Sequence, residues 1–274
     1  MIGILDSGTG GLTVARALGD LLPGMDMTYL GDTGRFPYGS RSSEKINAYV
    51  DQGVDFLVEK GAELIVFACV TSSAALLSRP GRSFAVPFVD AVTPTVDRLL
   101  ALPTCRRIGV VGTEATVRSG VFDVLINKRD PAARIYARSA PLLVPLIEDG
   151  RLDRPETRMI AKKYLHPLKV RQVGALVMAC NHYRLIRPLL QRKIGKRAKV
   201  VDCVSAVADS VKKYAEQHMR GGGGQAGAGG SRTYYLTDIT GRIASIGKMM
   251  FGRNLTFQYC ELQPRDKAQV RAAS

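Results

Sequence analysis

Short apolar runs alternate with polar loops and helix-like stretches along most of this sequence. A short apolar run bounded by turn residues is typical of a buried strand, and the stretches between the runs have the periodicity of helices. Parallel strands need such a crossover between them, so the alternation predicts an α/β fold with mainly parallel sheets. The predicted strands cover residues 2–5, 27–30, 63–68, 86–89, 107–111, 135–138, 175–179, 200–203, 233–237 and 255–262.

Helices are predicted between these strands. Ser42 or Ser43 can cap one of them, and Pro94 can open another. Pro167 is expected to break the helix that contains it, because proline has no amide hydrogen to donate. The predicted helices cover residues 12–22, 43–60, 94–101, 119–127, 155–170, 205–218 and 242–251, and a loop or helix is expected to start at 145–148.

The two halves of the chain echo each other. Residues 2–11 are mirrored by residues 108–120, and LIVFACV at 64–70 is mirrored by LVMACN at 176–181. Such a repeat predicts two similar α/β domains, related by a pseudo-twofold axis, with an active site in the cleft between them.

Each half of the repeat places one cysteine at the end of a strand, Cys69 in the first half and Cys180 in the second. Ligands of open α/β sheets bind at such strand ends, so two facing units would put the two sulfurs on opposite sides of one cleft. A thiolate on one face of an amino acid can remove the α-proton, and a thiol on the other face can return one. The pair therefore predicts an amino-acid racemase that works without a cofactor or a metal ion.

Polar side chains gather at the same strand ends, which suits a carboxylate ligand. Hydroxyls and backbone amides in these loops can stabilise the negative charge that spreads onto a carboxylate when the α-proton leaves. The residues concerned are Asp6, Ser7, Tyr38, Gly39, Thr71, Ser72, Ser73, Thr113, Thr116 and His182, of which Gly39 offers only its backbone.

Taken singly, each of these signals has another interpretation. A buried cysteine at a strand end is often an inert small hydrophobic residue. The DSGTGG loop at residues 6–11 could be a phosphate-binding turn before a helix, and His182 could serve only as a structural hydrogen-bonding residue. The remaining cysteines lack the paired arrangement and are expected to be structural or incidental: Cys105, Cys203 and Cys260.

The composition limits the classes of protein to consider. Of the 274 residues, 46% are hydrophobic, which is enough to bury a core, and no apolar run is long enough to cross a bilayer. Five cysteines without dense pairing, and an N-terminus without a secretory signal, favour a cytoplasmic protein. The formal charge of +15 fits a solvated basic surface, and without an aromatic-interleaved RNA motif it does not favour nucleic acid as a partner.

The most specific motifs are ILDSGTGGLTV (4–14), YLGDTGRFPYGSRS (29–42), FACVTSSAA (67–75), VPFVDAVTP (86–94), IGVVGTEATVRSG (108–120), VPLIEDG (144–150) and VMACNHYRLI (177–186). Together they resemble the glutamate racemase branch of the aspartate/glutamate racemase family. The resemblance runs from Ile2 to about Leu262, with the glycine-rich stretch at 221–230 as an insertion.

The resemblance implies a cofactor-independent enzyme that converts L-glutamate to D-glutamate for bacterial peptidoglycan, in a family in which homodimers are common. It implies a first domain of residues 1–93 plus 208–262 and a second of residues 94–207. By composition, residues 220–231 are expected to form a flexible loop and residues 263–274 a polar tail.

Carried over by position, the resemblance makes Cys69 and Cys180 the two acid–base residues. Asp6 would assist Cys69, and His182 would assist Cys180. Glu148 matches a further acidic residue near the second site. The residues that would hold the substrate, with the two threonines of the second half on its carboxylate, are Asp6, Ser7, Tyr38, Gly39, Val70, Thr71, Thr113, Thr116, Asn181 and His182.

The sequence departs from the family pattern at several positions. C-V-T at 69–71 replaces C-N-T, C-N-H-Y-R at 180–184 replaces C-T-H-Y-P, and Asp202-Cys203 replaces Asp-Ser. Val70 cannot hydrogen-bond through its side chain, and a lost contact costs about 1–3 kcal/mol if its partner stays unsatisfied. Asn181 adds an amide that can compensate. Two alternatives therefore stay open: a divergent paralogue with another amino-acid substrate, and a binding protein without turnover.

Overall fold

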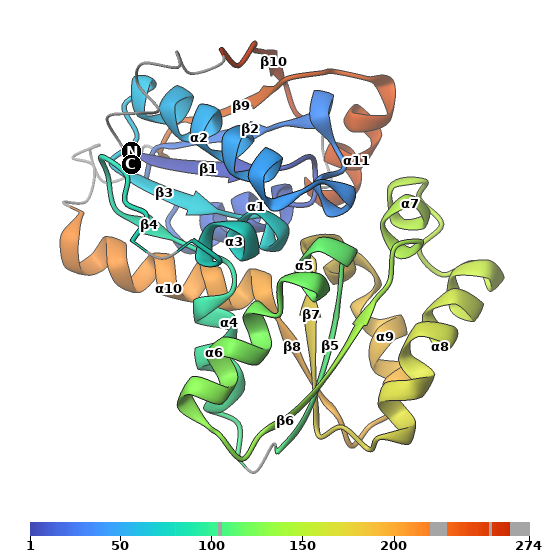
Figure 1. Ribbon diagram of the computed structural model, residues 1–274. Coiled ribbons are helices and arrows are strands. Elements are labelled where there is room, and N and C mark those ends of the chain that lie inside the picture. Colours follow the sequence, from blue (N-terminus) through green and yellow to red (C-terminus); the bar gives the residue numbers. More distant parts are fainter. Residues whose placement is uncertain (80, 104–105, 220–228, 252–253, 264–274) are drawn as a thin grey trace.

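The computed structural model describes residues 1–79, 81–103, 106–219, 229–251 and 254–263. Its strands form two parallel sheets, which occupy the upper and the lower half of Figure 1. Cys105, most of the predicted glycine-rich loop and nearly all of the predicted tail lie outside the described residues.

The first sheet has six strands in the order β10-β9-β2-β1-β3-β4, and every neighbouring pair is parallel. Its strands are β1 (Ile2–Asp6), β2 (Met27–Gly31), β3 (Leu64–Phe67), β4 (Phe88–Val89), β9 (Arg232–Leu236) and β10 (Gln258–Tyr259).

The second sheet has four strands in the order β6-β5-β7-β8, and these pairs are also parallel. Its strands are β5 (Arg107–Gly112), β6 (Arg134–Ser139), β7 (Ala175–Ala179) and β8 (Lys199–Asp202). Taken by position, this order repeats the β2-β1-β3-β4 part of the first sheet, so β7 holds the place of β3. The predicted α/β fold class is confirmed.

The helices follow the strands in alternation and cover the sheets (Figure 1). They are α1 (Leu12–Leu21), α2 (Ser43–Glu59), α3 (Val70–Leu77), α4 (Thr93–Leu100), α5 (Glu114–Ser119), α6 (Val121–Arg129), α7 (Leu143–Glu148), α8 (Pro155–Val170), α9 (Arg187–Ile194), α10 (Cys203–His218) and α11 (Gly241–Phe251). Short 3₁₀ turns are η1 (Thr33–Arg35), η2 (Tyr38–Ser40) and η3 (Asn181–Ile186).

Side chains of the first sheet alternate between its two faces, as the pleat of a strand requires. Ile4 and Val66 belong to the core cluster that contains residues of α1 and α10. Leu5 and Phe67, one position further along the same strands, belong to the cluster that contains residues of α2. Both faces are therefore covered, which explains why these strands read as continuous apolar runs.

One core cluster extends from the first half of the molecule into the second. Ile108 and Val110 of β5 belong to the same cluster as Ile4 of β1, together with Val96 of α4 and Val204 of α10. The opposite face of the second sheet has a core of its own, shared with α8 and α9. The predicted domain boundaries stay a prediction, since α4 and α10 contribute to the shared core.

Several elements differ from the sequence-based expectation, among them helices α5 and α9, which were not predicted. Helix α8 is not broken at Pro167 but continues to Val170. The proline lies in the last turn, so its missing amide hydrogen costs one hydrogen bond near the helix end. Helix α3 was not predicted, since its sequence VTSSAALL carries no strong amphipathic period. The predicted strand at 255–262 is reduced to β10 (Gln258–Tyr259).

No helix in the ranges that the structure describes is both long enough and apolar enough to cross a membrane.

The aromatic cluster behind β3 supports the strand that leads to Cys69. Phe67 is fully buried, and its ring centroid lies 5.7 Å from that of Phe84 and 5.5 Å from that of Phe88. We expect Phe67→Ala to lower the free energy of unfolding by about 3–5 kcal/mol, because the lost contacts leave a cavity in the core. Urea denaturation measures this loss. Phe67→Leu keeps most of the volume and should cost clearly less; equal costs would contradict the packing argument.

Candidate active site

Both cysteines at the repeated strand ends lie on the wall of one cavity. Cys69 directly precedes α3, next to the end of β3, and Cys180 directly follows β7. The cavity has a volume of about 300 Å³, and both side chains line it although each is only 8% exposed. A cavity of this size is at the small end of the range for small-molecule sites.

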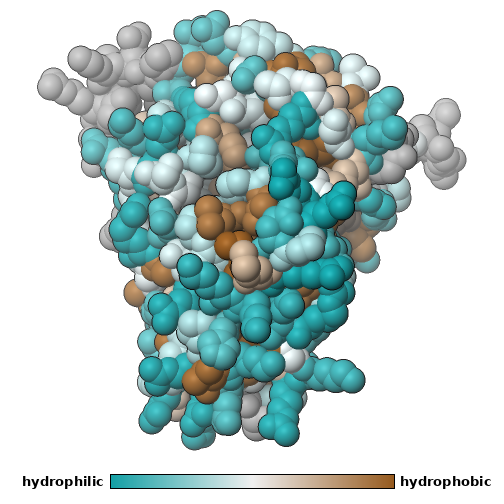
Figure 2. All heavy atoms as spheres, turned by 90° about the vertical axis from the view of Figure 1, so that its right-hand side faces the viewer, coloured by the Kyte–Doolittle hydropathy of each residue, from teal (hydrophilic) through white to brown (hydrophobic). Residues whose placement is uncertain are grey.

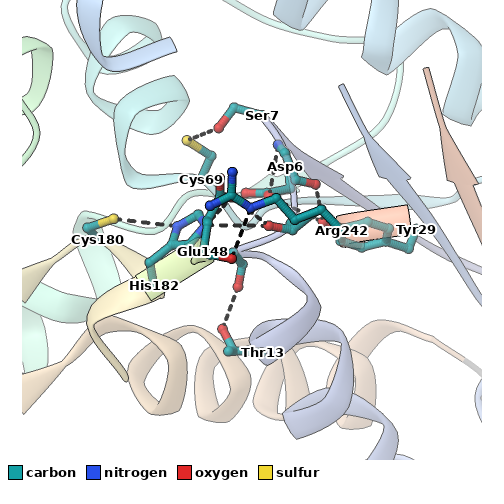
Figure 3. A network of polar contacts seen from close by, with 12 residues as sticks. Asp6, Ser7, Thr13, Tyr29, Cys69, Glu148, Cys180, His182 and Arg242 are labelled. Atoms are coloured by element: carbon teal, nitrogen blue, oxygen red, sulfur yellow. Dashed lines mark hydrogen bonds and ion pairs between the residues drawn. The ribbon is translucent and has the colours of Figure 1, made fainter. Parts of the chain in front are cut away.

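Cys69 lies among hydrogen-bond donors of the first half. Ser7 Oγ donates to the Cys69 sulfur at 3.1 Å, and the sulfur stands at the N-terminus of α3, where backbone amides favour negative charge (Figure 3). Burial raises the pKa of the Cys69 thiol, and the charge of Asp6 raises it further, while bonds from Ser7 and Ser72 act in the opposite direction. The resting thiol therefore keeps its proton, beside groups that can stabilise the thiolate.

Asp6 lies behind Cys69 and is itself buried. Its Oδ2 accepts from the Gly8 amide at 3.1 Å and lies 3.2 Å from the Tyr29 hydroxyl. Burial raises the pKa of Asp6, and bonds from the Gly11 and Gly8 amides partly oppose this. A carboxylate with a raised pKa next to a thiol is suited to accept a proton from it.

Cys180 has a different partner, the imidazole of His182. The Cys180 sulfur lies 3.8 Å from His182 Nδ1, and His182 Nε2 lies 3.0 Å from Glu148 Oε1 (Figure 3). Burial by itself would lower the pKa of His182, but the contacts with Cys180 and Glu148 raise it to about 10. His182 is therefore cationic at neutral pH, and its charge stabilises negative charge on the Cys180 sulfur.

The Glu148–His182 pair is also held from the first half of the molecule. Thr9 Oγ1 donates to Glu148 Oε1 at 2.9 Å and lies 3.4 Å from His182 Nε2. Gly10 passes so close to the imidazole that a Cβ there would lie 2.5 Å from His182 Nδ1. Burial would raise the pKa of Glu148, but the bond with His182 holds it below its usual value.

Three threonine hydroxyls meet across the cleft. Thr71 Oγ1 lies 2.9 Å from Thr113 Oγ1 and 3.3 Å from Thr116 Oγ1, and the latter two are 2.9 Å apart. Thr71 comes from α3 of the first half, and Thr113 and Thr116 come from the loop and helix after β5. Hydroxyls that satisfy one another here can reorient to donate to a carboxylate.

Nearly all of the predicted site residues line the cavity. Tyr38 lines the cavity, but its hydroxyl already donates to the buried Asp32. Burial and the charge of Asp32 raise the pKa of Tyr38. Thr116 lies behind Thr113 and is not part of the wall. The predicted residues on the wall are Asp6, Ser7, Tyr38, Gly39, Cys69, Val70, Thr71, Thr113, Glu148, Cys180, Asn181 and His182.

Several residues of the site were not predicted, and three of them contact its charged residues. Thr9 stands between Ser7 and Gly10 in the first loop, and its hydroxyl was the available signal. Tyr29 reaches Asp6 from β2, which the motif gave no reason to expect. Arg242 of α11 lines the cavity and bonds the Glu148 carbonyl at 3.1 Å, and only the return of the chain to the first sheet brings it there.

The face that carries α7 and α11 is shown in Figure 2. Hydrophobic side chains gather at mid-height of this face, and the part below is mostly hydrophilic.

Within the residues that the structure describes, no group of three or more His, Cys, Asp or Glu side chains is arranged to hold a metal ion.

Known proteins share both the sequence pattern and the fold of this chain. Residues 12–211 match the model of the Asp/Glu/Hydantoin racemase family. The chain belongs to this family. A glutamate racemase of Syntrophus aciditrophicus is 37% identical over 255 residues, 93% of each chain, and one of Aquifex aeolicus is 34% identical over 272 residues, 98% of each. The predicted family and enzyme class are confirmed.

Solved structures of racemases from this family superpose on the chain. Glutamate racemase from Francisella tularensis, in complex with D-glutamate, has a TM-score of 0.85 and 28% identity, covering 95% of this chain and 97% of that one. The glutamate racemase isoform RacE1 from Bacillus anthracis has a TM-score of 0.89 at 24% identity, covering 96% and 97%, and supports the fold alone.

The charge on His182 predicts how the stability of this racemase-family protein depends on pH. Its pKa of about 10 in the folded state exceeds the ordinary value of 6.5, so the stabilisation is complete below pH 6.5 and is lost as the pH rises through about 10. Relative to His182→Gln, the free energy of unfolding should fall by up to about 1.4 kcal/mol per pH unit in this window.

Urea denaturation of both proteins from pH 6 to pH 10 measures this difference. His166→Gln, at an exposed histidine of α8, is the matched control and should follow the wild type throughout. A difference between wild type and His182→Gln that stays constant from pH 6 to pH 10 would contradict a cationic His182.

Proposed function

We propose that this protein racemises glutamate by moving the α-proton between Cys69 and Cys180 without a cofactor. The observation that carries the proposal is the shared cavity, whose wall includes two thiols from corresponding strand ends of the two sheets. The curated relatives are glutamate racemases, and the Francisella neighbour was solved in complex with D-glutamate.

In one direction, Cys69 acts as the base. The thiol first gives its proton to a nearby group, for which the Asp6 carboxylate is suited, and Ser7 and the N-terminus of α3 stabilise the thiolate. The thiolate then removes the α-proton from one face of glutamate. Cys180 delivers its thiol proton to the opposite face, and the configuration at the α-carbon is inverted.

The first transfer leaves Cys180 as a thiolate and Cys69 as a thiol, and from this state the other direction starts, with Cys180 as the base and Cys69 as the acid. The cationic imidazole of His182 stabilises the Cys180 thiolate, and Glu148 keeps that imidazole charged and oriented. Each sulfur therefore has its own assistant, a carboxyl group for Cys69 and an imidazole for Cys180.

Removal of the α-proton places negative charge on the α-carboxylate, which has to be stabilised in the transition state. Ser7, Thr71 and Thr113 line the cavity, and their hydroxyls can donate to the carboxylate. The first residues of α3, Val70 and Thr71, also line the cavity, and backbone amides at the start of a helix favour an anion. Tyr38, Gly39 and Val70 complete the predicted binding residues on the wall, and Asn181 lies there with its side-chain amide bonded to Ala68 and Cys203. Thr116 supports Thr113 from behind.

We further propose that the product D-glutamate serves peptidoglycan synthesis in the cytoplasm and that the protein forms a homodimer. The family resemblance supports these three statements.

Deuterium exchange tests the proposed reaction. Protein incubated with L-glutamate in deuterated water should form D-glutamate that carries α-deuterium, while the remaining L-glutamate stays largely unlabelled at early times, because a separate thiol serves each face. Mass spectrometry after chiral separation gives both quantities. Absence of exchange with both enantiomers would overturn the proposal.

Removal of either thiol tests the assignment of the two bases. Cys69→Ala and Cys180→Ala should each lower kcat by about 10²-fold to 10⁴-fold or more, since each removes one acid–base group. Cys260→Ala is the matched control, because Cys260 is equally buried but does not line the cavity. Wild-type turnover by either cavity variant would contradict the two-thiol scheme.

A further inference from the structure

Asn181 lines the cavity between the two residues that carry the chemistry of the second half, Cys180 and His182. Its side chain makes contacts away from the cavity: the amide nitrogen donates to the Ala68 carbonyl, and the Cys203 thiol donates to the amide oxygen at 2.9 Å. We infer that Asn181 is a positioning residue that ties the two cysteine-bearing strand ends together, with Cys203 holding its amide in place. We call these three residues, Ala68, Asn181 and Cys203, the amide bridge.

The amide bridge joins three strand ends that meet at the cavity. Ala68 lies between β3 and Cys69, Asn181 directly follows Cys180 after β7, and Cys203 begins α10 after β8. The bond from Asn181 to Ala68 therefore links the backbone next to one catalytic sulfur with the backbone next to the other. Through this bond the separation of the two sulfurs is fixed by a side chain that need not touch the substrate.

Burial makes the amide bridge costly to break. Asn181 is 4% exposed and Cys203 is 1% exposed. A buried amide group without a partner carries a desolvation penalty, so both ends of Asn181 need these bonds. Cys203 itself does not line the cavity, so its replacement is expected to affect turnover through Asn181.

The inference rests on the proposed racemisation. Steady-state kinetics with both enantiomers of glutamate shows whether Asn181 positions the thiols or binds the substrate. Asn181→Leu should lower kcat about 10-fold or more, because small misplacements of reacting groups are expensive, while KM stays within about twofold. Cys203→Ala should lower kcat about threefold to tenfold with the same unchanged KM. Cys203→Ser keeps a donor and should retain at least about half of the wild-type kcat.

The double variant gives the sharpest comparison. If Cys203 acts only through Asn181, then Asn181→Leu combined with Cys203→Ala should be no slower than Asn181→Leu alone, within about twofold. Cys260→Ala again serves as the control for loss of a buried thiol. A KM that rises about tenfold in Asn181→Leu with kcat unchanged would make Asn181 a substrate contact and overturn the inference. A Cys203→Ala variant with the kcat of the wild type would also overturn it.

Alkylation of the two cavity thiols tests the amide bridge without substrate. Iodoacetamide should modify Cys69 and Cys180 faster in Asn181→Leu and in Cys203→Ala than in wild type or Cys203→Ser, as followed by peptide mass spectrometry. Equal rates in all four proteins would overturn the inference. If wild type fails to turn over glutamate while these rates differ as stated, the proposed function fails and the amide bridge stands.

Discussion

Parallel pairing of strands within each sheet is the constraint on which the site depends. Because β1 and β3 run in the same direction, Asp6 and Cys69 reach the same edge of the first sheet. The same holds for the second sheet, where β5 and β7 bring Thr113 and Cys180 to one edge. When the two edges face each other, groups far apart along the chain surround a single cavity.

The two thiols stand in different electrostatic surroundings although their strands correspond. Cys69 has neutral donors and the start of a helix beside it, with a buried carboxyl group behind. Cys180 has a charged imidazole, which is held in that state by Glu148. The two cysteines therefore have corresponding backbone positions but different side-chain partners. Each direction of proton transfer has its own set of stabilising groups.

Much of the fold and the central pair of the site could be predicted, because both depend on local patterns. Apolar runs and turn residues located β1, β3 and β7, and the cysteine after each of two matching runs located the chemistry. Arg242 could not be found this way, since it reaches the cavity only through the long-range pairing of β9 with β2. The engagement of Tyr38 with Asp32 was also hidden, because the orientation of a side chain depends on neighbours that a motif does not specify.

The chain passes between the two sheets twice, once from β4 into α4 and once from β8 into α10. The two crossing helices are paired by the contact of Arg98 with Asp209. Because the two halves are joined at two places, sliding one half past the other would stretch one of the connections. Rotation about the line through both connections would stretch neither. We therefore expect any opening of the cleft to be a hinge rotation near α4 and α10, which would have to break the bonds of Thr71 to Thr113, of Thr9 to Glu148 and of Asn181 to Ala68.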